Sequence, residues 1–329
     1  MEDRIVSVVA LAAAFLLSLL FGRLILPVLR AKKAGQPISE YAPDAHKAKA
    51  GTPTMGGIGF VPAFLLTIAG VVIYWTVAVP DSRLIPVALV VLYALGNTAI
   101  GFVDDYFKLN KRQNEGLTEA QKFILQVVIA AAFIAMMAIT DNLTTAFHIP
   151  FTSIRWNIGF FAYPVYLIVL VGFVNATNIT DGLDGLATSI TMTVALFMAV
   201  FALTSGEGEI AALASALLGC MLGFILFNHH PAKMFMGDTG SLFLGAVIMG
   251  CALMAGELLL FILAGFMFVV EMLSSFLQRL YFKLTHGKRI FKMAPLHHHF
   301  EKCGWREVKI VLVFSFVSLV FCVLAFLGR

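Results

Sequence analysis

The sequence predicts an all-α integral membrane protein, a bundle of about ten transmembrane helices. Three observations lead to this fold class. The mean hydropathy is +0.92, and only 13 % of the residues are charged while 60 % are hydrophobic. Apolar runs long enough to cross a bilayer recur along the whole chain. Such runs are expected to be helices, because open strands would leave backbone polar groups unsatisfied in lipid.

The expected spans follow one another with short connections. In chain order they are 5–29, 56–79, 84–103, 122–140, 161–178, 186–204, 210–227, 241–255, 258–282 and 307–327. The first lacks a small-residue cleavage site, so we expect it to remain as a span and not to be a removable signal peptide. No repeat, linker or soluble domain interrupts the pattern, which predicts a single polytopic membrane domain over residues 1–329. The alternating TSIRWNIGF within the connection 141–160 predicts a small β-hairpin.

Lysine and arginine residues set the expected orientation. With alternating loops, one side receives eighteen of the twenty-three: Arg30, Lys32, Lys33, Lys47, Lys49, Lys108, Lys111, Arg112, Lys122, Lys233, Arg279, Lys283, Lys288, Arg289, Lys292, Lys302, Arg306 and Lys309. The other side and the spans hold Arg4, Arg23, Arg83, Arg155 and Arg329. Cytoplasmic loops are enriched in these residues, so the basic side is predicted to be cytoplasmic and both termini extracytoplasmic.

The cysteines and the net charge exclude some classes of protein. Cys220, Cys251, Cys303 and Cys322 show no CxxC spacing, and three of them lie within expected spans, so we predict neither a disulfide nor a zinc site. The formal net charge of +4 comes from the cytoplasmic loops. Such loops suit membrane lipid headgroups and phosphorylated substrates, and we expect no nucleic-acid partner.

Five aspartates lie where apolar segments end on the predicted cytoplasmic side. Asp104 and Asp105 belong to GFVDDYFK, Asp181 and Asp184 to NATNITDGLDGLA, and Asp238 to FMGDTGS. An isolated carboxylate near hydrocarbon is costly, so five of them need a cation or a polar ligand. A metal-bound phosphate is the leading candidate, and hard oxygen ligands near phosphates suit Mg²⁺. The sequence therefore predicts an active-site cleft on the cytoplasmic side.

The adjacent pair Asp104 and Asp105 ends the third expected span. Neighbours on a helix point about 100° apart, so we do not expect both to chelate one ion easily. Lys108 lies four residues after Asp104 and is expected to hold that carboxylate ionised. The alternative is a solvated helix end with one ion pair. It fits a carboxylate pair directly after AIGFV less well, because desolvation would raise both pKa values unless a cation compensates.

Polar residues recur through NATNITDGLDGLA. Asp181 and Asp184 are three apart and are expected to share a helical face, with Asn175 and Asn178 one turn earlier. Four polar side chains in one stripe, with glycines that allow close backbone approach, predict a lined cavity. Capping and turn formation is the alternative, and it explains only Asp181 and the glycine after it.

Two further segments combine glycine turns with helix starts. Asp238 follows Gly237 at the expected beginning of a helix, and an N-cap aspartate is the alternative to a metal ligand there. In HKAKAGTPTMGG (46–57), two lysines and a histidine precede a turn that opens a helix. Free backbone amides with Lys47 and Lys49 beside them favour an anion. A positively charged cytoplasmic anchor followed by a turn is the alternative.

The final cytoplasmic loop contains RIFKMAPLHHHFEKCGW (289–305). Three consecutive histidines face different ways and do not by themselves predict zinc. His297 and His299 would share a face if the segment is extended, and imidazole can donate to phosphate oxygens. Glu271 and Gln278, seven apart in the ninth expected span, are predicted to point into the bundle.

These motifs together resemble the signatures of the bacterial phospho-N-acetylmuramoyl-pentapeptide transferases, the MraY family. HKAKAGTPTMGG, GFVDDYFK, NATNITDGLDGLA, NHHPAKMFMGDTGS and MAPLHHHFEKCGW occur in family order from residue 46 to 305. The wider superfamily of polyprenyl-phosphate sugar-1-phosphate transferases usually has an acidic residue where Lys108 stands and a different histidine motif. Lys108 and MAPLHHHFE therefore favour the muramoyl branch over an N-acetylglucosamine-1-phosphate transferase.

The resemblance implies a ten-helix enzyme of the bacterial cytoplasmic (inner) membrane, homodimeric and Mg²⁺-dependent. It would join UDP-N-acetylmuramoyl-pentapeptide to undecaprenyl phosphate, giving lipid I and UMP for peptidoglycan synthesis. Direct attack by the lipid phosphate is favoured, since that nucleophile already carries a charge of about −1.5 to −2 near pH 7. A covalent aspartyl intermediate is the alternative. An ion-coupled secondary transporter is the rival class, but transporter sites lie near the membrane midplane, whereas these aspartates gather on one side.

The resemblance also implies roles for individual residues. Asp238 is the expected Mg²⁺ ligand, and Asp104 and Asp105 act at the phosphates together with His297. The residues expected around the nucleotide are Lys49, Thr54, Asn178, Asp181, Asp184, Phe235 and Gln278. Those expected near the phosphates and sugar are Lys108, Lys122, Asn228, His297, His298 and His299. Lys47 and Asn175 complete the expected substrate-binding set.

Overall fold

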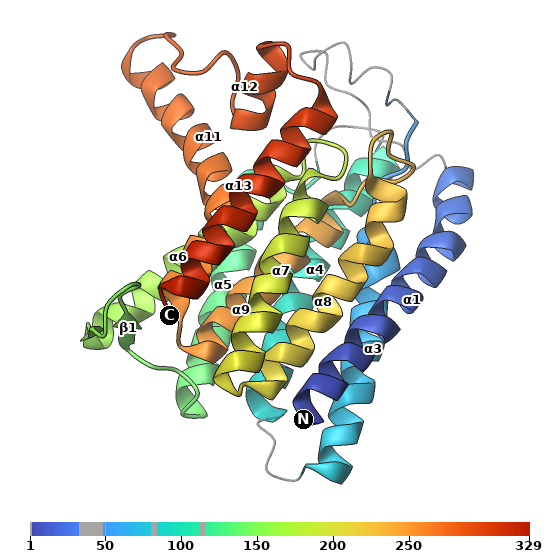
Figure 1. The fold of residues 1–329 in the computed structure, drawn as a ribbon. Helices are drawn as coiled ribbons and strands as arrows, with labels where there is room; N and C mark the ends of the chain where they lie inside the picture. Colours follow the sequence, from blue (N-terminus) through green and yellow to red (C-terminus); the bar gives the residue numbers. More distant parts are fainter. Residues whose placement is uncertain (1, 33–48, 50, 80–83, 112–115) are drawn as a thin grey trace.

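The computed structural model describes residues 2–32, 49, 51–79, 84–111 and 116–329. In these ranges the regular elements are helices apart from one hairpin (Figure 1). The long helices are α1 (Glu2–Ala31), α3 (Gly57–Ala78), α4 (Leu84–Lys111), α5 (Glu119–Ile139), α6 (Ala162–Thr180), α7 (Leu186–Ser205), α8 (Gly208–Asn228), α9 (Gly237–Ala255), α11 (Phe266–Leu284) and α13 (Glu307–Leu327). The short elements are β1 (Ala146–His148), β2 (Arg155–Asn157), the 3-10 turn η1 (Gly159–Phe161), α10 (Leu258–Ala264) and α12 (Leu296–Lys302).

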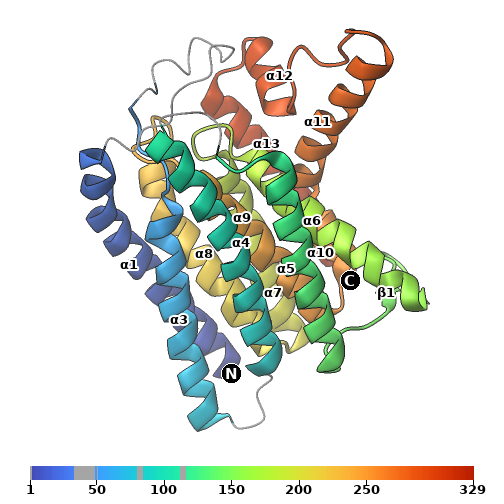
Figure 2. The same cartoon turned by 180° about the vertical axis from the view of Figure 1, so that it is seen from behind.

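The predicted spans correspond to these helices. Among the described residues, nine helices are long and apolar enough to cross a membrane, and the bent pair α10 and α11 raises the number to ten. The all-α membrane class is confirmed. A hairpin is present within 141–160, but only β2 lies in TSIRWNIGF, and it pairs antiparallel with β1, which precedes that segment. The start of α1 and the end of α13 lie toward the end of the bundle opposite α12 (Figures 1 and 2).

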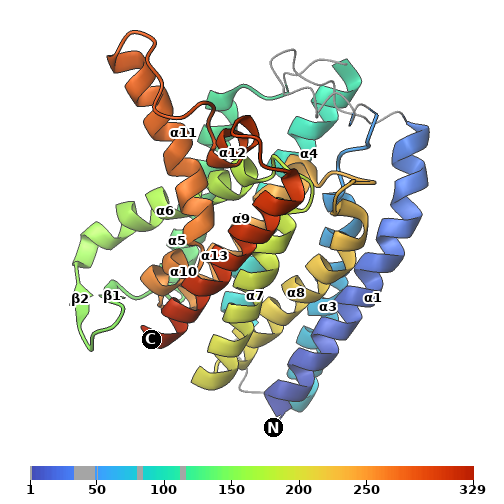
Figure 3. The same ribbon diagram turned by 45° about the horizontal axis from the view of Figure 1, so that its top comes forward.

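The expected continuous span 258–282 is wrong. It consists of α10 and α11, which meet at Gly265 with a bend of 79°. Glycine is a poor helix former, so a helix breaks readily at such a position. The bend directs α11 away from the other helices, as Figures 1 and 3 show. The inner face of α11 nevertheless buries Glu271, Ser274 and Gln278, which confirms that Glu271 and Gln278 point inward.

Helices α8 and α9 form the centre of the bundle. Both are buried on nearly all sides, as expected for helices that are apolar all round. Helices α1, α3 and α7 pack on α8, while α4 and α6 pack on α9. The first turn of α9 therefore lies between the ends of α4 and α6, where the sequence places the aspartates.

The close crossing of α4 and α9 depends on Gly101. A Cβ atom there would meet the backbone carbonyl of Asp238, and it would lie 2.6 Å from the Thr239 nitrogen. We expect Gly101→Ala to force the two helices apart at a cost of ~1–3 kcal/mol. The expected result is a lower midpoint of thermal unfolding in detergent and weaker activity, because Asp104 and Asp105 follow on the same helix.

Gly70→Ala in α3 is the matched control, because no atom lies within 4 Å of a Cβ at that position. Alanine is the better helix former, so this variant should unfold at the wild-type temperature or slightly above it. Equal unfolding midpoints for the two variants would show that the α4–α9 crossing does not require Gly101.

Candidate active site

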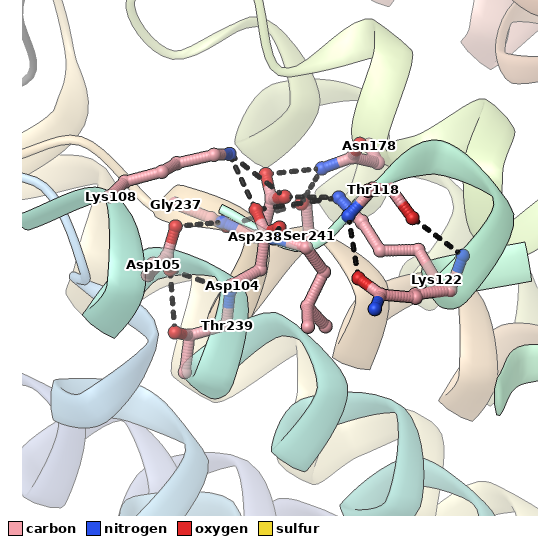
Figure 4. A network of polar contacts seen from close by, with 12 residues as sticks. Asp104, Asp105, Lys108, Thr118, Lys122, Asn178, Gly237, Asp238, Thr239 and Ser241 are labelled. Atoms are coloured by element: carbon pink, nitrogen blue, oxygen red, sulfur yellow. Dashed lines mark hydrogen bonds and ion pairs between the residues drawn. The ribbon is translucent and has the colours of Figure 1, made fainter. Parts of the chain in front are cut away.

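Three carboxylates from two helices converge at the crossing of α4 and α9. Asp104 and Asp105 come from α4 and Asp238 from the first turn of α9 (Figure 4). One oxygen from each lies within 4.8 Å of the other two. We call these three residues the carboxylate cluster. Asp104 and Asp105 thus both reach the crossing, although neighbours on a helix point about 100° apart.

Asp105 uses both carboxylate oxygens to hold the start of α9. Its Oδ2 accepts hydrogen bonds from Thr239 N at 2.9 Å and Thr239 Oγ1 at 2.6 Å, and its Oδ1 accepts one from Asp238 N at 3.2 Å. The first amides of a helix have no partner within the helix, so α4 supplies the cap that α9 lacks. The backbone of Gly237 makes this approach possible, since its φ is +74° and a Cβ would lie 2.6 Å from Asp105 Oδ2.

Asp238 is not the N-cap of α9. Met236 occupies that position without a side-chain capping bond, and Asp238 lies in the first turn. Its Oδ2 is 2.5 Å from Lys122 Nζ and 3.3 Å from Lys108 Nζ, and its Oδ1 accepts a hydrogen bond from Asn178 Nδ2 at 2.8 Å. The alternative of a simple capping aspartate is therefore not what the structure contains, and Asp238 faces the cations.

Asp104 forms the ion pair that the sequence predicts. Lys108 Nζ lies 2.6 Å from Asp104 Oδ2, and Lys122 Nζ lies 3.6 Å from the same oxygen. The other oxygen, Oδ1, accepts a hydrogen bond from Leu117 N at 2.8 Å. The Asp104 side chain is buried, so these contacts carry its charge within the protein.

Lys122 reaches the cluster because α5 begins just before it. Thr118 caps α5, and its hydroxyl and the Gln121 side chain form a reciprocal capping box. The first turn of α5 thereby directs Lys122 toward Asp238 (Figure 4). The spacing T-x-x-Q in the sequence is the signal for this capping box.

The donor set fits a divalent metal. Three carboxylates and two ammonium groups leave one net negative charge, and hard cations prefer oxygen ligands. Among the described residues Asp104 Oδ2 has no hydrogen-bond partner besides its lysine ion pairs, so this buried oxygen has capacity for a further ligand. Asp104 and Asp238 offer their oxygens more freely than Asp105, whose oxygens hold α9.

The turn between α6 and α7 separates the remaining two aspartates. Asp181 and Asp184 do not share a helical face, because α6 ends at Thr180 and α7 begins at Leu186. Gly182 and Gly185 interrupt the helical run. Burial raises the pKa of Asp181 well above its usual range, and the charges of Asp238, Asp105 and Asp184 add to this effect. Asp184 points into a different group of residues.

That second group, the Asp184 cluster, consists of Lys49, Asp184, His230 and Glu307. Lys49 Nζ lies 2.7 Å from Asp184 Oδ1 and 2.6 Å from Glu307 Oε1. Glu307 Oε1 also accepts a hydrogen bond from Asp184 N at 2.5 Å, and His230 Nδ1 lies 3.0 Å from Asp184 Oδ2. Sequence reasoning missed Glu307, because a single acidic residue at the start of α13 forms no motif.

The histidine segment is helical, so the extended arrangement considered from the sequence is wrong. Residues 296–302 form α12 directly after Pro295. The buried His297 ring places Nδ1 2.7 Å from Glu271 Oε2, and its backbone N donates to Glu271 Oε1 at 3.2 Å. The other ring nitrogen, Nε2, is buried and has no hydrogen-bond partner among the described residues.

Two residues expected at the nucleotide or sugar, Gln278 and His299, also bond the loop before α12, and Gln278 lines the cavity described below. Gln278 Oε1 accepts from the backbone N of Ile290 and of Phe291, both at 3.0 Å. His299 Nδ1 accepts from Lys292 N at 3.1 Å. These side chains fix the backbone that leads into α12, whereas His298 is paired with Glu301 at 2.6 Å.

The segment before α3 packs against the connection from α8 to α9. The amides of Gly56 and Gly57 donate to the carbonyl oxygens of Phe235 and Met236 at 2.8 and 3.0 Å. The expectation of free amides for an anion at this helix start is therefore wrong. Phe235 N donates in turn to Pro53 O at 2.8 Å. Thr54 is buried beside this pairing, and its hydroxyl has no hydrogen-bond partner among the described residues.

Three more residues were expected to bind substrate: Asn228, Asn175 and Lys47. Asn228 is buried and bonds Met234 O and Thr188, so it shapes the connection from α8 to α9. Asn175 donates to Gln126 Oε1 at 2.7 Å, away from the carboxylate cluster. Lys47 lies outside the described residues.

A cavity of about 810 Å³ adjoins the carboxylate cluster. Asn178 and Asp181 line one end, as the sequence predicts, whereas Asn175 and Asp184 do not line it. The remaining walls come from α11 and from residues 289–302. Asn178 thus contacts both the cavity and Asp238.

Comparisons with known proteins agree with this arrangement. Residues 87–256 match the family described as glycosyl transferase family 4, and residues 49–61 match phospho-N-acetylmuramoyl-pentapeptide-transferase signature 1. The chain is 43 % identical over 320 residues to the phospho-N-acetylmuramoyl-pentapeptide-transferase of Clostridium perfringens strain SM101, covering 97 % of this chain and 95 % of that one. Proteins of the same name from Clostridium kluyveri strain NBRC 12016 and Staphylococcus carnosus are 42 % and 41 % identical over 316 and 310 residues. These alignments cover 96 % and 93 % of this chain, and 96 % and 94 % of the relatives.

The membrane helices, the carboxylate cluster and the family 4 match together define a polytopic membrane glycosyl transferase. Within that class, the chain belongs to the phospho-N-acetylmuramoyl-pentapeptide-transferase family.

Proposed function

We propose that this protein transfers phospho-N-acetylmuramoyl-pentapeptide from its UDP donor to undecaprenyl phosphate, with Mg²⁺ as cofactor, and forms lipid I and UMP in peptidoglycan synthesis. The observation that carries the proposal is the convergence of Asp104, Asp105 and Asp238 with Lys108 and Lys122 at the end of the bundle. Phosphoryl transfer needs positioning and charge stabilisation more than covalent chemistry from the protein, and this group supplies both.

Each residue of the site has a proposed part in the reaction. Asp104 and Asp238 would hold the Mg²⁺, which would neutralise charge on the donor diphosphate. Lys108 and Lys122 stabilise negative charge on the phosphate oxygens as it develops. Asp105 keeps the start of α9 in place and so positions Asp238. The lipid phosphate attacks the sugar-linked phosphorus directly, and the bond from that phosphorus to the bridging oxygen breaks, so that UMP leaves. The nucleophile is already an anion and needs little help from a base.

An assay of the purified protein tests this function. Radiolabelled UDP-N-acetylmuramoyl-pentapeptide and undecaprenyl phosphate should give labelled lipid with Mg²⁺ and none with a chelator in its place. UDP-N-acetylglucosamine, offered as the sole donor, distinguishes the other branch of the superfamily. The proposal would be contradicted if labelled lipid formed from UDP-N-acetylglucosamine but not from UDP-N-acetylmuramoyl-pentapeptide. Labelled lipid from either donor with the chelator present would contradict it as well.

We also propose that the protein lies in the bacterial inner membrane with the site on the cytoplasmic side, which the basic loops support. In a cysteine-free version, Ile290→Cys should resist an impermeant thiol reagent in intact cells and react after lysis. Trp156→Cys in β2, near the opposite end of the bundle, is the control and should react in intact cells. Both positions are exposed. The reverse labelling pattern would overturn the orientation.

Glu307 is expected to act on donor binding through Lys49 and Asp184. Glu307→Ala removes the acceptor for Lys49 Nζ and Asp184 N, and a lost hydrogen bond to a charged group costs ~1.5–3 kcal/mol. If Lys49 and Asp184 contact the nucleotide, KM for the UDP donor should rise roughly tenfold or more, while kcat changes little. Glu307→Gln keeps one acceptor oxygen and should restore part of the affinity. A fall in kcat at unchanged KM would contradict this role.

A further inference from the structure

The cavity beside the carboxylate cluster has an uneven distribution of charge. Arg279, Arg289, Lys292 and Lys302 line the part formed by α11 and residues 289–302. Asp181 is the one acidic side chain among the described residues that line it, and it lies in the turn after α6. We call the part lined by these four cations the basic cavity. It presents a positive wall at a distance from the carboxylates.

The four cations have no acidic partners in the described part of the chain. No ion pair joins any of them to a carboxylate there. Lys292 Nζ contacts the Lys302 carbonyl oxygen at 3.3 Å, and Arg289 lies 5.9 Å from the centre of the Phe282 ring. Four unpaired positive charges around one cavity favour an anionic ligand.

A second observation indicates that the cavity receives a polar ligand. His297 lines it and is fully buried, with Nδ1 engaged by Glu271. Its Nε2 lies close to Gly182, where an added Cβ would meet it, and has no hydrogen-bond partner among the described residues. A buried polar atom left without a partner costs free energy, so a ligand group at this position would satisfy it.

Asn178 connects the cavity with the carboxylate cluster. Asn178 lines the cavity and donates to Asp238 Oδ1 at 2.8 Å. A donor whose diphosphate lies at the cluster can therefore extend its sugar past His297 and its peptide toward Arg289 and Lys302. A peptide ends in a carboxylate, the group that guanidinium binds with two parallel hydrogen bonds.

We propose that the basic cavity binds the C-terminal carboxylate of the donor's peptide through Arg279, Arg289 and Lys302. This inference rests on the proposed function, because it takes the peptide donor as the substrate. The basic cavity would then distinguish a donor with a complete, charged peptide from one that lacks the terminal carboxylate. Binding of this carboxylate, which lies far from the reacting phosphorus, would let the enzyme select between donors whose reacting groups are the same.

Two donors that differ in a single group test the proposal. One is UDP-N-acetylmuramoyl-pentapeptide, and the other is the same molecule with a C-terminal carboxamide. We expect the wild-type full-length protein to favour the carboxylate donor roughly tenfold or more in kcat/KM, the loss typical of one charged hydrogen bond. In the double variant Arg289→Gln, Lys302→Gln the ratio should fall toward one. Lys283→Gln, at an exposed residue outside the cavity, should keep the wild-type ratio.

Dissociation constants for the two donors, measured without the lipid acceptor, repeat the comparison independently of turnover. The proposal would be overturned if the wild type bound the carboxylate and carboxamide donors with equal affinity. It would also be overturned if the folded double variant kept the wild-type preference for the carboxylate donor. The double variant could instead lose activity on both donors to the same extent and regain it in vesicles that contain phosphatidylglycerol. That result would assign the four cations to lipid headgroups and would also overturn the proposal. Tight, carboxylate-dependent binding with no transfer to the lipid would contradict the proposed function and leave the cavity assignment supported.

Discussion

Asp238→Asn is expected to lower kcat by about 100-fold or more while the protein stays folded. The substitution removes the negative charge that faces Lys122 at 2.5 Å and Lys108 at 3.3 Å. The asparagine oxygen can still accept the hydrogen bond from Asn178, so packing at the start of α9 is preserved. The expected loss is therefore electrostatic, and it includes a ligand of the proposed Mg²⁺.

The measurement is UMP release at saturating donor, lipid and Mg²⁺, together with the thermal unfolding midpoint in detergent. Asp141→Asn makes the same chemical change in the connection between α5 and β1, away from the carboxylate cluster, and should leave both quantities at wild-type values. Near-normal turnover by folded Asp238→Asn would remove Asp238 from the metal site.

The second large effect concerns the difference between Asp104 and Asp105. Asp105→Ala leaves two amides and one hydroxyl at the start of α9 without their acceptor, at ~1–3 kcal/mol for each buried group. We expect a clearly lower unfolding midpoint and a loss of turnover, because Asp238 is no longer held in position. Asp104→Ala removes one acceptor for Leu117 N and an ion pair with Lys108. It should slow the reaction with a smaller effect on stability. Equal unfolding midpoints in the two variants would contradict the assignment of Asp105 to positioning α9.

The same variants distinguish direct attack from a covalent aspartyl intermediate. With labelled donor and enzyme depleted of lipid, direct attack predicts no UMP and no labelled protein. A covalent route predicts one burst of UMP equal to the enzyme concentration and acid-stable label on the protein, and both should disappear in the alanine variant of the nucleophile. Such a burst would overturn the one-step reaction.

Several elements of the fold followed from local properties of the sequence. The helices that span the bilayer were predictable, because apolar length and the need to satisfy backbone groups in lipid act within each segment. The pair of Asp104 with Lys108 was predictable for the same reason, since four residues on a helix bring two side chains together. Strand β2 and the start of α9 near Asp238 also followed from local patterns.

Other predictions failed where a neighbouring segment overrode the local pattern. The amides of Gly56 and Gly57 are bonded to the connection from α8 to α9, which no feature of HKAKAGTPTMGG reveals. Asp184 does not share a helical face with Asp181, because the chain turns between α6 and α7 and Asp184 pairs with Lys49. Periodicity describes directions from one helix axis, and it contains no information on where a second helix lies.

Local sequence patterns were enough to predict the membrane class, the positions of the spans other than 258–282, and the residue types that reach the site. The pairing of these residues became known from the packed helices: Asp105 with the first turn of α9, Glu307 with Lys49 and Asp184, and Glu271 with His297. The physical reason is that each span is stabilised by its own hydropathy and backbone hydrogen bonds, whereas a pair of distant side chains depends on how closely the helices that carry them pack.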